Sequence, residues 1–221
     1  MSQDNPSSGS VLRLAAVGRL VVPVAHDINN PLTAVLGRIQ LHMTRGSAGM
    51  PRGPGGLDDI YEQALVISDK VQTLGTLARE SIAAAPPTPV VLTDHVAEVT
   101  QLLGRYIARR GMELHVDIPT TIPPVLVRPV DLKLCIAEVL LAFCGAVRNP
   151  APLHIVAEAQ GDKVQLSIVA QGLLPSEVSL AAEGAHLMGI AAADGLTLTV
   201  EESFRLSMPV AGPSRPAVAL G

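Results

Sequence analysis

Two segments of this sequence place apolar residues alternately three and four positions apart, which forms a continuous stripe along a helix. The longer stripe runs through Leu57, Ile60, Ala64, Ile67, Val71, Leu74 and Ala78. A shorter stripe runs through Ile28, Leu32, Val35 and Ile39. This heptad spacing is typical of helices that pair along a narrow seam. The sequence therefore predicts two long helices, within residues 11–45 and 57–84.

A loop separates the two predicted helices. Residues 46–56 contain five glycines and two prolines in eleven positions, a composition that interrupts regular structure. Two helices joined in this way form an antiparallel hairpin. Because one hairpin buries little apolar surface, two hairpins are expected to pair as a four-helix bundle. The sequence thus predicts a homodimer, with residues 11–84 as its dimerisation hairpin.

Residues 94–210 have a different pattern, which predicts an α+β domain. Helices are expected over 94–110, 131–147 and 185–193. Alternation of polar and apolar residues predicts strands over 113–118, 153–159, 163–169, 196–200 and 204–208. Gly161 and Asp162 are expected to form the turn of a hairpin. A proline-rich linker over 85–93 would precede this domain, with a disordered lead over 1–10 and a loose tail over 211–221.

Composition excludes several classes of protein. The chain of 221 residues is 48% hydrophobic and 16% charged, which suits a buried core rather than a disordered chain. Its net charge of −4 and its lack of a basic excess argue against nucleic acid as a partner. With two Tyr, two Phe and no Trp, a site built on base stacking is not expected.

The sequence also bears on the compartment. The polar N-terminus lacks a signal-peptide pattern, and the apolar run over 139–147 is far shorter than the ~18 residues of a membrane-spanning helix. Cys135 and Cys144 form no CxxC motif and are expected to be buried core residues in a reducing compartment. We therefore expect a soluble cytoplasmic protein that contacts no membrane and has no metal site of its own.

The segment VAHDINNPL, residues 24–32, carries the most specific chemistry. A rotation of 100° per residue places His26 about 160° from the seam at Ile28, on the solvent face. Asn30 lies one turn further along, and Asp27 lies between this face and the seam. Pro31 lacks an N–H group, so the helix should bend where the carbonyl of Asp27 loses its donor.

These three side chains predict a site for phosphoryl chemistry. An exposed neutral imidazole can attack phosphorus and form a phosphohistidine. The carboxylate of Asp27 can orient the ring and take its proton, and the amide of Asn30 can bind phosphoryl oxygens or position a water. The alternative for His26 is an ordinary solvated histidine. We interpret the remaining histidines in that ordinary way: His42, His95, His115, His154 and His186.

Pro23 lies three residues before His26, where a helix interior disfavours proline by about 3 kcal/mol. Either it kinks the helix and exposes the imidazole, or the first helix starts after it. The sequence leaves both alternatives open.

The run VAHDINNPLTAVLGRIQL resembles the phosphoacceptor motif of bacterial sensor histidine kinases, His-Glu/Asp-x-x-Asn-Pro-Leu. The match covers His26, Asp27, Asn30, Pro31 and Leu32, on the first of two helices as in that family. The resemblance implies that His26 carries the phosphoryl group and that Asp27 is the general base. It also implies that Asp27 and Asn30 take part in dephosphorylating a response regulator.

The rest of the chain weakly resembles the GHKL ATP-binding domain of the same family, an α/β sandwich of the Bergerat type. Residues 130–147 resemble its nucleotide-contacting helix, and 163–172 resemble the strand that leads to its first glycine box. Residues 187–200 and 203–209 resemble its closing helix and last strands.

Departures from that family pattern predict a degenerate domain. Glu138 and Ala142 stand where the family has Asn-x-x-x-Asn, and alanine has no atom to hold Mg²⁺. Ala170 and Gly172 stand in place of Asp-x-Gly-x-Gly, without its Asp and second Gly. Residues 175–184 lack the Gly-x-Gly of a phosphate-binding lid. These losses remove the electrostatic stabilisation that phosphoryl transfer from a nucleotide requires, so no nucleotide is expected to bind.

The sequence therefore predicts a phosphotransfer protein that exchanges the phosphoryl group of His26 with aspartates of response regulator receiver domains, without using ATP. It resembles those phosphorelay proteins that descend from histidine kinases. The receiver would supply Mg²⁺, so no cofactor is expected on this chain. One alternative is an ATP-dependent histidine kinase with a divergent pocket. The other is a non-catalytic dimeric module that binds or dephosphorylates a response regulator.

Overall fold

The computed structural model describes residues 8–45, 56–83, 85–172, 178, 185, 188–189, 191–192, 195–200 and 203–212. Its helices are α1 (Ser8–Arg45), α2 (Leu57–Ile82), α3 (Leu92–Arg109) and α4 (Pro129–Ala146). Its strands are β1 (Thr88–Val90), β2 (Met112–Asp117), β3 (Val125–Val127), β4 (Ala151–Gln160), β5 (Lys163–Ala170), β6 (Thr197–Val200) and β7 (Phe204–Pro209). The fold is α+β, as predicted.

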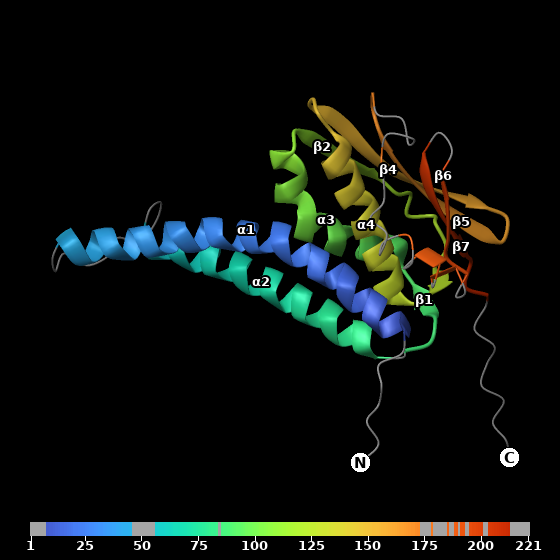
Figure 1. Cartoon of the computed structure of the whole chain (residues 1–221), viewed down its shortest axis with the longest axis horizontal. Coiled ribbons are helices and arrows are strands. Elements are labelled where there is room, and N and C mark those ends of the chain that lie inside the picture. Colours follow the sequence, from blue (N-terminus) through green and yellow to red (C-terminus); the bar gives the residue numbers. More distant parts are fainter. Residues whose placement is uncertain are drawn as a thin grey trace, which may run out of the picture.

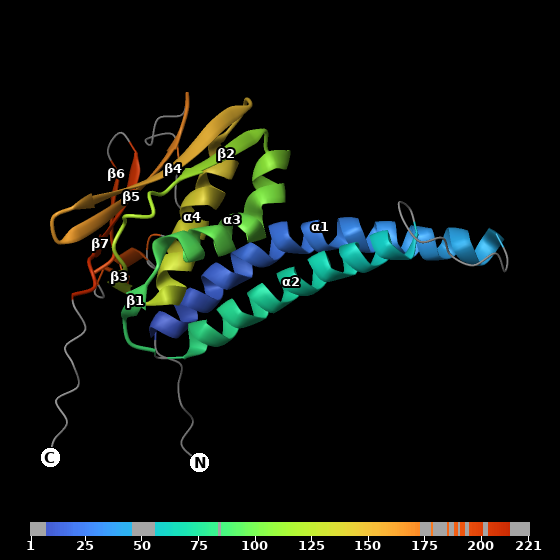
Figure 2. The same cartoon turned by 180° about the vertical axis from the view of Figure 1, so that it is seen from behind.

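Helices α1 and α2 form the predicted antiparallel hairpin, whose distal half projects away from the rest of the molecule (Figure 1). The disordered lead predicted over residues 1–10 is wrong for its last three residues, because α1 begins at Ser8. Helix α1 continues through both Pro23 and Pro31, so a start after Pro23 is also excluded. Two views show α1 changing direction near its middle, the part that contains both prolines (Figures 1 and 2).

Five of the described strands form one sheet in the order β2-β4-β5-β7-β6. Strands β2 and β4 pair in parallel, and the other neighbours pair antiparallel. The predicted hairpin of β4 and β5 is confirmed, with Gln160 opposite Lys163 and Gly161 at φ +64°. Strands β1 and β3 pair with each other and were not predicted. The linker expected over 85–93 therefore contains a strand and the start of α3.

The core lies between this sheet and helices α3 and α4. Alternate residues of β4, β5 and β7 are buried and face the helices. Phe143 of α4 meets Phe204 of β7 edge to face, with ring centroids 5.3 Å apart. The N-terminal half of α1 packs on the other side of α3 and α4 (Figure 2). This part of the molecule therefore has three layers, which are the sheet, the pair α3 and α4, and the N-terminal half of α1. Because α4 lies in the middle layer, almost every side of this helix is buried.

Ion pairs fasten the hairpin to the helix layer. Arg13 of α1 donates two hydrogen bonds to the carboxylate of Asp131 of α4, with Nη2 2.9 Å from Oδ2. Both side chains are at most 4% exposed. Lys133 of α4 lies 3.0 Å from Glu80 of α2 and 3.2 Å from Glu98 of α3. Since buried charges must be paired to be tolerated, these contacts fix how α1 and α2 sit on the domain.

The expected heptad seam of α2 is only partly buried within one chain. Leu74 and Ala78 pack against the core, but Leu57 and Val71 are 49% and 55% exposed. The most deeply buried side chains of this helix are instead those of Lys70, Leu77 and Ser81. Helix α2 therefore turns one row of residues toward α3 and α4 and leaves part of the predicted seam facing outward.

Several predictions fall on residues outside the described part of the chain. Of the short helix predicted over 185–193, residues 185, 188–189 and 191–192 are described and are helical. The segment 175–184 is described only at Val178, and the predicted tail only at 211–212. Within the residues that the structure describes, no helix is both long and apolar enough to cross a membrane.

Candidate functional site

His26 lies on α1 where that helix passes the C-terminal end of α3. Its side chain is exposed, as the helical rotation predicts. The Nδ2 amide nitrogen of Asn30, also exposed, lies 3.4 Å from the Nδ1 atom of the imidazole. The structure therefore brings together two of the three predicted site residues on one face of α1.

Asp27 departs from its predicted position. It was expected between the solvent face and the seam, beside the imidazole, but it is only 1% exposed. Its Oδ1 atom lies 2.7 Å from Arg109 of α3, and its Oδ2 atom lies 3.7 Å from Lys70 of α2. Packing of α2 and α3 around α1 encloses this carboxylate, which a view of α1 by itself cannot foresee. In the described structure neither carboxylate oxygen accepts an aligned hydrogen bond, so the contacts with Arg109 and Lys70 are ion pairs.

Lys70 ties the three helices together at this point. Its Nζ atom donates a hydrogen bond of 2.8 Å to the carbonyl of Leu102 in α3 while it faces Asp27 of α1. Burial lowers the pKa of Lys70 below its ordinary value, and the charge of Arg105 lowers it further, whereas Asp27 opposes the shift. A buried lysine that satisfies one carboxylate and one carbonyl sets the spacing of α1, α2 and α3.

Arg109, the last residue of α3, contacts both neighbouring residues of the predicted motif. Its Nη1 atom contacts Nδ1 of His26, and its Nη2 atom contacts Oδ1 of Asp27. The guanidinium carbon lies 6.0 Å from the centroid of the Tyr106 ring. One side chain of the α+β domain therefore spans the imidazole and the carboxylate of the hairpin.

Sequence reasoning missed Lys70 and Arg109. Lys70 lies in one row with Leu74, Leu77 and Ser81 of α2, and a lysine in an otherwise buried row signals a paired charge. Arg109 follows Arg105 by one turn at the end of a helix, where a cation is ordinarily explained by the helix dipole. No spacing in the sequence indicates which carboxylate it meets, because it lies 83 residues from His26.

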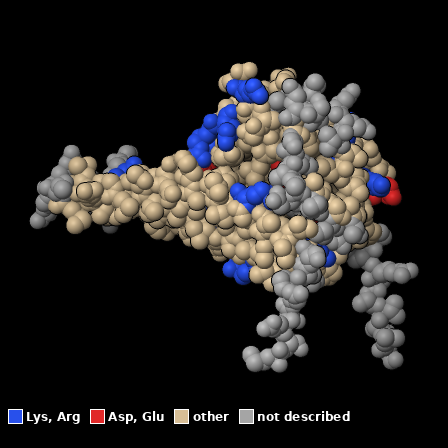
Figure 3. Space-filling model, in the orientation of Figure 1, with Lys and Arg blue, Asp and Glu red and all other residues tan. Residues whose placement is uncertain are grey.

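Three cationic side chains lie close together beside the site. Lys70 and Arg109 form ion pairs with Asp27, and Arg105 lies close enough to Lys70 to lower the pKa of that lysine. Figure 3 shows Lys and Arg side chains gathered on the visible face over α3, beside the hairpin. Cations around an exposed imidazole suit the negative charge of a phosphoryl group.

The predicted nucleotide-contacting helix is covered at Glu138. Arg19 of α1 donates hydrogen bonds to both oxygens of its carboxylate, with Nη2 2.7 Å from Oε1 and Nε 3.2 Å from Oε2. Glu138 is 3% exposed, and almost all of α4 from Val130 to Leu140 is buried. The N-terminal part of α1 thus covers α4 at this position.

The other degenerate positions lie nearby. Ala142 is partly buried against the core, and Ala170 is the buried last residue of β5. Gly172 follows it at φ +76°, a left-handed conformation that favours glycine. A cavity of about 740 Å³ opens between this turn and the end of α4. Among the described residues its lining includes Arg148, Asn149 and Gln171 but no acidic side chain.

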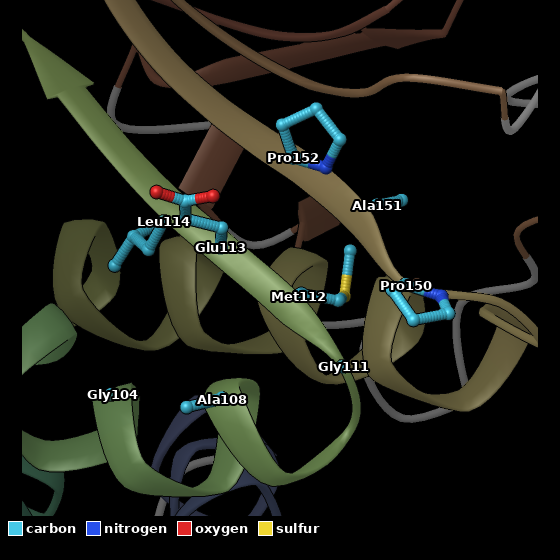
Figure 4. Close-up of a pocket in the computed structure, with 9 residues that line it drawn as sticks. All are labelled: Gly104, Ala108, Gly111, Met112, Glu113, Leu114, Pro150, Ala151 and Pro152. Carbon is cyan, nitrogen blue, oxygen red and sulfur yellow. The ribbon is translucent and has the colours of Figure 1, made fainter.

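The remaining features offer little chemistry. A second cavity, of about 620 Å³, lies between α3, β2 and the start of β4, and Glu113 is the one charged residue that lines it (Figure 4). The described residues contain no group of three His, Cys, Asp or Glu side chains that could hold a metal ion. Cys135 and Cys144 are buried, as predicted, and burial raises the pKa of the Cys144 thiol to about 11. Neither thiol is placed to act as a nucleophile.

Comparisons with known proteins agree with the motif. No family model matches the chain. The sensor histidine kinase ZraS of Escherichia coli strain K12 is 23% identical over 165 residues, which cover 72% of this chain and 34% of the relative. Sporulation kinase E of Bacillus subtilis is 24% identical over 173 residues, which cover 76% of this chain and 22% of the relative. The chain thus spans about a third or less of the length of these curated relatives.

Among solved structures, histidine kinase AdeS of Acinetobacter baumannii aligns with a TM-score of 0.48 and 15% identity, over 85% of this chain and 98% of that one. In its amino-acid sequence, the chain resembles the sensor histidine kinases.

Proposed function

We propose that this chain is a phosphotransfer protein of a two-component system. It accepts a phosphoryl group on His26 and exchanges it with an aspartate of a response regulator receiver domain, without using ATP. The observation that carries the proposal is a contrast between two surfaces of the same molecule. His26 is open to a partner at a cationic site, whereas Glu138 on the nucleotide-contacting helix is closed by Arg19.

The proposed exchange begins with the lone pair of a ring nitrogen of His26. It attacks the phosphorus of the receiver's acyl phosphate, so that an N–P bond forms as the P–O bond to the aspartate breaks. The aspartate leaves as a carboxylate with the electron pair of that bond. In this proposal the proton on the other ring nitrogen passes to the carboxylate of Asp27, the next residue of the motif, once Arg109 has moved away from it. Onward transfer runs through the same steps in reverse.

The degenerate domain has a structural role in this proposal. Ala142 supplies no metal ligand, and the Glu138 carboxylate would repel nucleotide phosphates even without Arg19. The residues present therefore do not fit Mg-ATP. We expect the Mg²⁺ of the reaction to belong to the receiver. The domain positions Arg109 beside His26 and presents one wall to the docking partner.

A homodimer is part of the proposal. The distal hairpin exposes apolar side chains on both helices, and such an extended apolar face is typical of an interface. These side chains include Leu32, Leu36, Ile39, Leu41, Met43, Leu57, Tyr61, Leu65 and Val71. A second hairpin would bury them in a four-helix bundle and complete the seam that is exposed in one chain.

The test compares two donors on the wild type, His26→Ala and the control His115→Ala, which alters an exposed histidine of β2. Each protein is incubated with Mg²⁺ and γ-radiolabelled ATP, and separately with receiver domains carrying a radiolabelled phosphoryl group. We expect acid-labile label from the receivers on the wild type and on His115→Ala, and none on His26→Ala. ATP is expected to label none of the three. Label on His26→Ala would remove the central claim.

A second candidate is an ATP-dependent histidine kinase. The cavity beside Gly172 supports it, because that cavity is large enough for a small ligand and carries Arg148 and Asn149. It predicts His26-dependent label from ATP. A protein that binds receivers tightly but takes label from neither donor would instead be a non-catalytic binding or phosphatase module.

A further inference from the structure

The imidazole of His26 is held by donors on one side of the ring. Nδ1 is contacted by the guanidinium of Arg109 and lies 3.4 Å from the amide nitrogen of Asn30. A guanidinium has only donors and never loses its proton in proteins, and an amide nitrogen also donates. Nδ1 must therefore be the acceptor in these contacts.

This arrangement fixes the tautomer of the neutral ring. Since Nδ1 accepts, the single ring proton resides on Nε2. Nδ1 has its lone pair occupied by Arg109, and Nε2 has no lone pair to offer. In this form neither nitrogen is a nucleophile toward phosphorus.

The Arg109 side chain also forms an ion pair with Asp27, the predicted general base. Arg109 Nη2 lies 2.7 Å from Oδ1 of Asp27, which is 1% exposed. Lys70 faces the other carboxylate oxygen at 3.7 Å and is itself anchored to the carbonyl of Leu102. Asp27 is therefore held by two cations, one on α2 and one at the end of α3.

We propose that Arg109 is a positioning residue that gates phosphoryl exchange at His26: while it donates to Nδ1, the ring can neither take up nor give up a phosphoryl group at Nε2. The inference rests on the proposed function of His26 and adds a control that the sequence motif does not contain. Arg109 lies outside the motif, at the end of α3, and its side chain is 36% exposed, so rotation of this side chain away from His26 would open the gate and its return would close it.

The position of the ring proton explains why exchange is blocked in both directions. For uptake, the ring needs its proton on Nδ1 and its lone pair on Nε2, which then forms the N–P bond as the donor's bond to phosphorus breaks. Arg109 at Nδ1 excludes that proton. For release, Nδ1 must gain a proton so that Nε2 can leave with the electrons of the N–P bond. Arg109 excludes that proton too, so the gate also preserves a stored phosphoryl group.

The tautomer is tested directly on the wild-type protein by nitrogen-15 NMR of histidine side chains, with His26→Ala used to assign the signals. At a pH where the ring is neutral, His26 should show a protonated Nε2 and an unprotonated Nδ1. In Arg109→Met the ring should shift toward the mixture of tautomers found in free histidine. A wild-type ring protonated at Nδ1 would overturn the proposal, and this result needs no variant to fold.

Rates are measured with phosphoramidate, a small donor that phosphorylates histidine without a partner protein. In Arg109→Met both the uptake of phosphate by His26 and its later loss should be about tenfold faster than in the wild type, the scale of one lost hydrogen bond to a charged donor. Arg109→Lys keeps a cation for Asp27 but cannot span both groups, so it should also be faster. The matched control is Arg110→Met, since Arg110 donates to the Tyr106 hydroxyl instead.

The outcomes separate the two proposals. If His26→Ala takes up phosphate as well as the wild type, the proposed function fails. If uptake depends on His26 but Arg109→Met is unchanged in rate and tautomer, the function stands and the gate is wrong. Slower exchange in Arg109→Met would mean that the guanidinium binds the phosphoryl group, and it would equally overturn the gate.

Discussion

Arg19 of α1 and Glu138 of α4 form a two-pronged ion pair, with Arg19 Nη2 2.7 Å from Oε1 and Nε 3.2 Å from Oε2. Glu138 stands where the GHKL pattern that this domain resembles has the first Asn of Asn-x-x-x-Asn. The carboxylate that departs from that pattern is therefore used to hold the hairpin against the domain. This departure from the sequence pattern is thus a structural contact in the fold.

Replacing Arg19 with methionine should destabilise the protein by about 3 kcal/mol, because Glu138 is left buried without its guanidinium partner. The double variant Arg19→Met, Glu138→Met should recover most of this loss, since both charges are then absent. Urea unfolding monitored by circular dichroism measures the free energy of unfolding. A double variant no more stable than Arg19→Met would show that the two side chains are not coupled.

Leu36 of α1 is 58% exposed in one chain and lies on the distal hairpin. Leu36→Glu should weaken dimerisation by about tenfold or more, because it places two carboxylates in the apolar bundle of the dimer. The stability of the α+β domain should not change. Sedimentation velocity over a concentration series gives the dissociation constant.

The control for that variant is Val91→Glu, a similar change at a side chain 50% exposed beside α3. It should leave dimerisation as it is in the wild type. If both variants dimerise equally well, the distal hairpin is not the interface.

Asp27→Asn should destabilise the protein by about 3 kcal/mol, because Lys70 is then buried without a carboxylate. The control is Asp69→Asn, which removes a carboxylate from an exposed position of the same hairpin and should cost less than about 0.5 kcal/mol. Thermal and urea unfolding of the two variants can be compared directly. Equal stability of Asp27→Asn and the wild type would show that the buried carboxylate does not organise the three helices.

His95 of α3 gives a pH dependence. Burial lowers its pKa below the ordinary 6.5, and the charge of Lys133 adds to this. The carboxylates of Glu98, Asp94 and Glu80 oppose the shift. Within the described structure neither ring nitrogen has a hydrogen-bond partner. As the pH falls below 6.5, the unfolded chain takes up a proton on His95 before the folded chain does, so stability is lost on acidification.

As the pH falls from about 8 to about 5, the unfolding free energy of the wild type should therefore fall more steeply than that of His95→Gln. The other titratable groups are the same in both proteins, so their contributions cancel in the difference between the two unfolding free energies. A constant difference over this range would contradict a lowered pKa for His95.

Periodicity was enough to predict the long helices and most strands, because each depends on neighbours in the sequence. The exposure of His26 followed from the 100° rotation of a helix. Strands β1 and β3 were missed because each has three residues and its pairing partner lies far along the chain. The continuation of α1 through Pro23 also could not be predicted from the sequence, because tertiary packing decides whether a helix continues past a proline.

The candidate site divides in the same way. His26 and Asn30 share a face because they lie one turn apart on one helix, so the sequence by itself determined their relation. The burial of Asp27 and the arrival of Lys70 and Arg109 depended on three helices meeting at one point. Only the tertiary structure decided this, because the energy of a charge depends on what surrounds it in space. No periodicity in the sequence relates residues such as His26 and Arg109, which lie 83 positions apart.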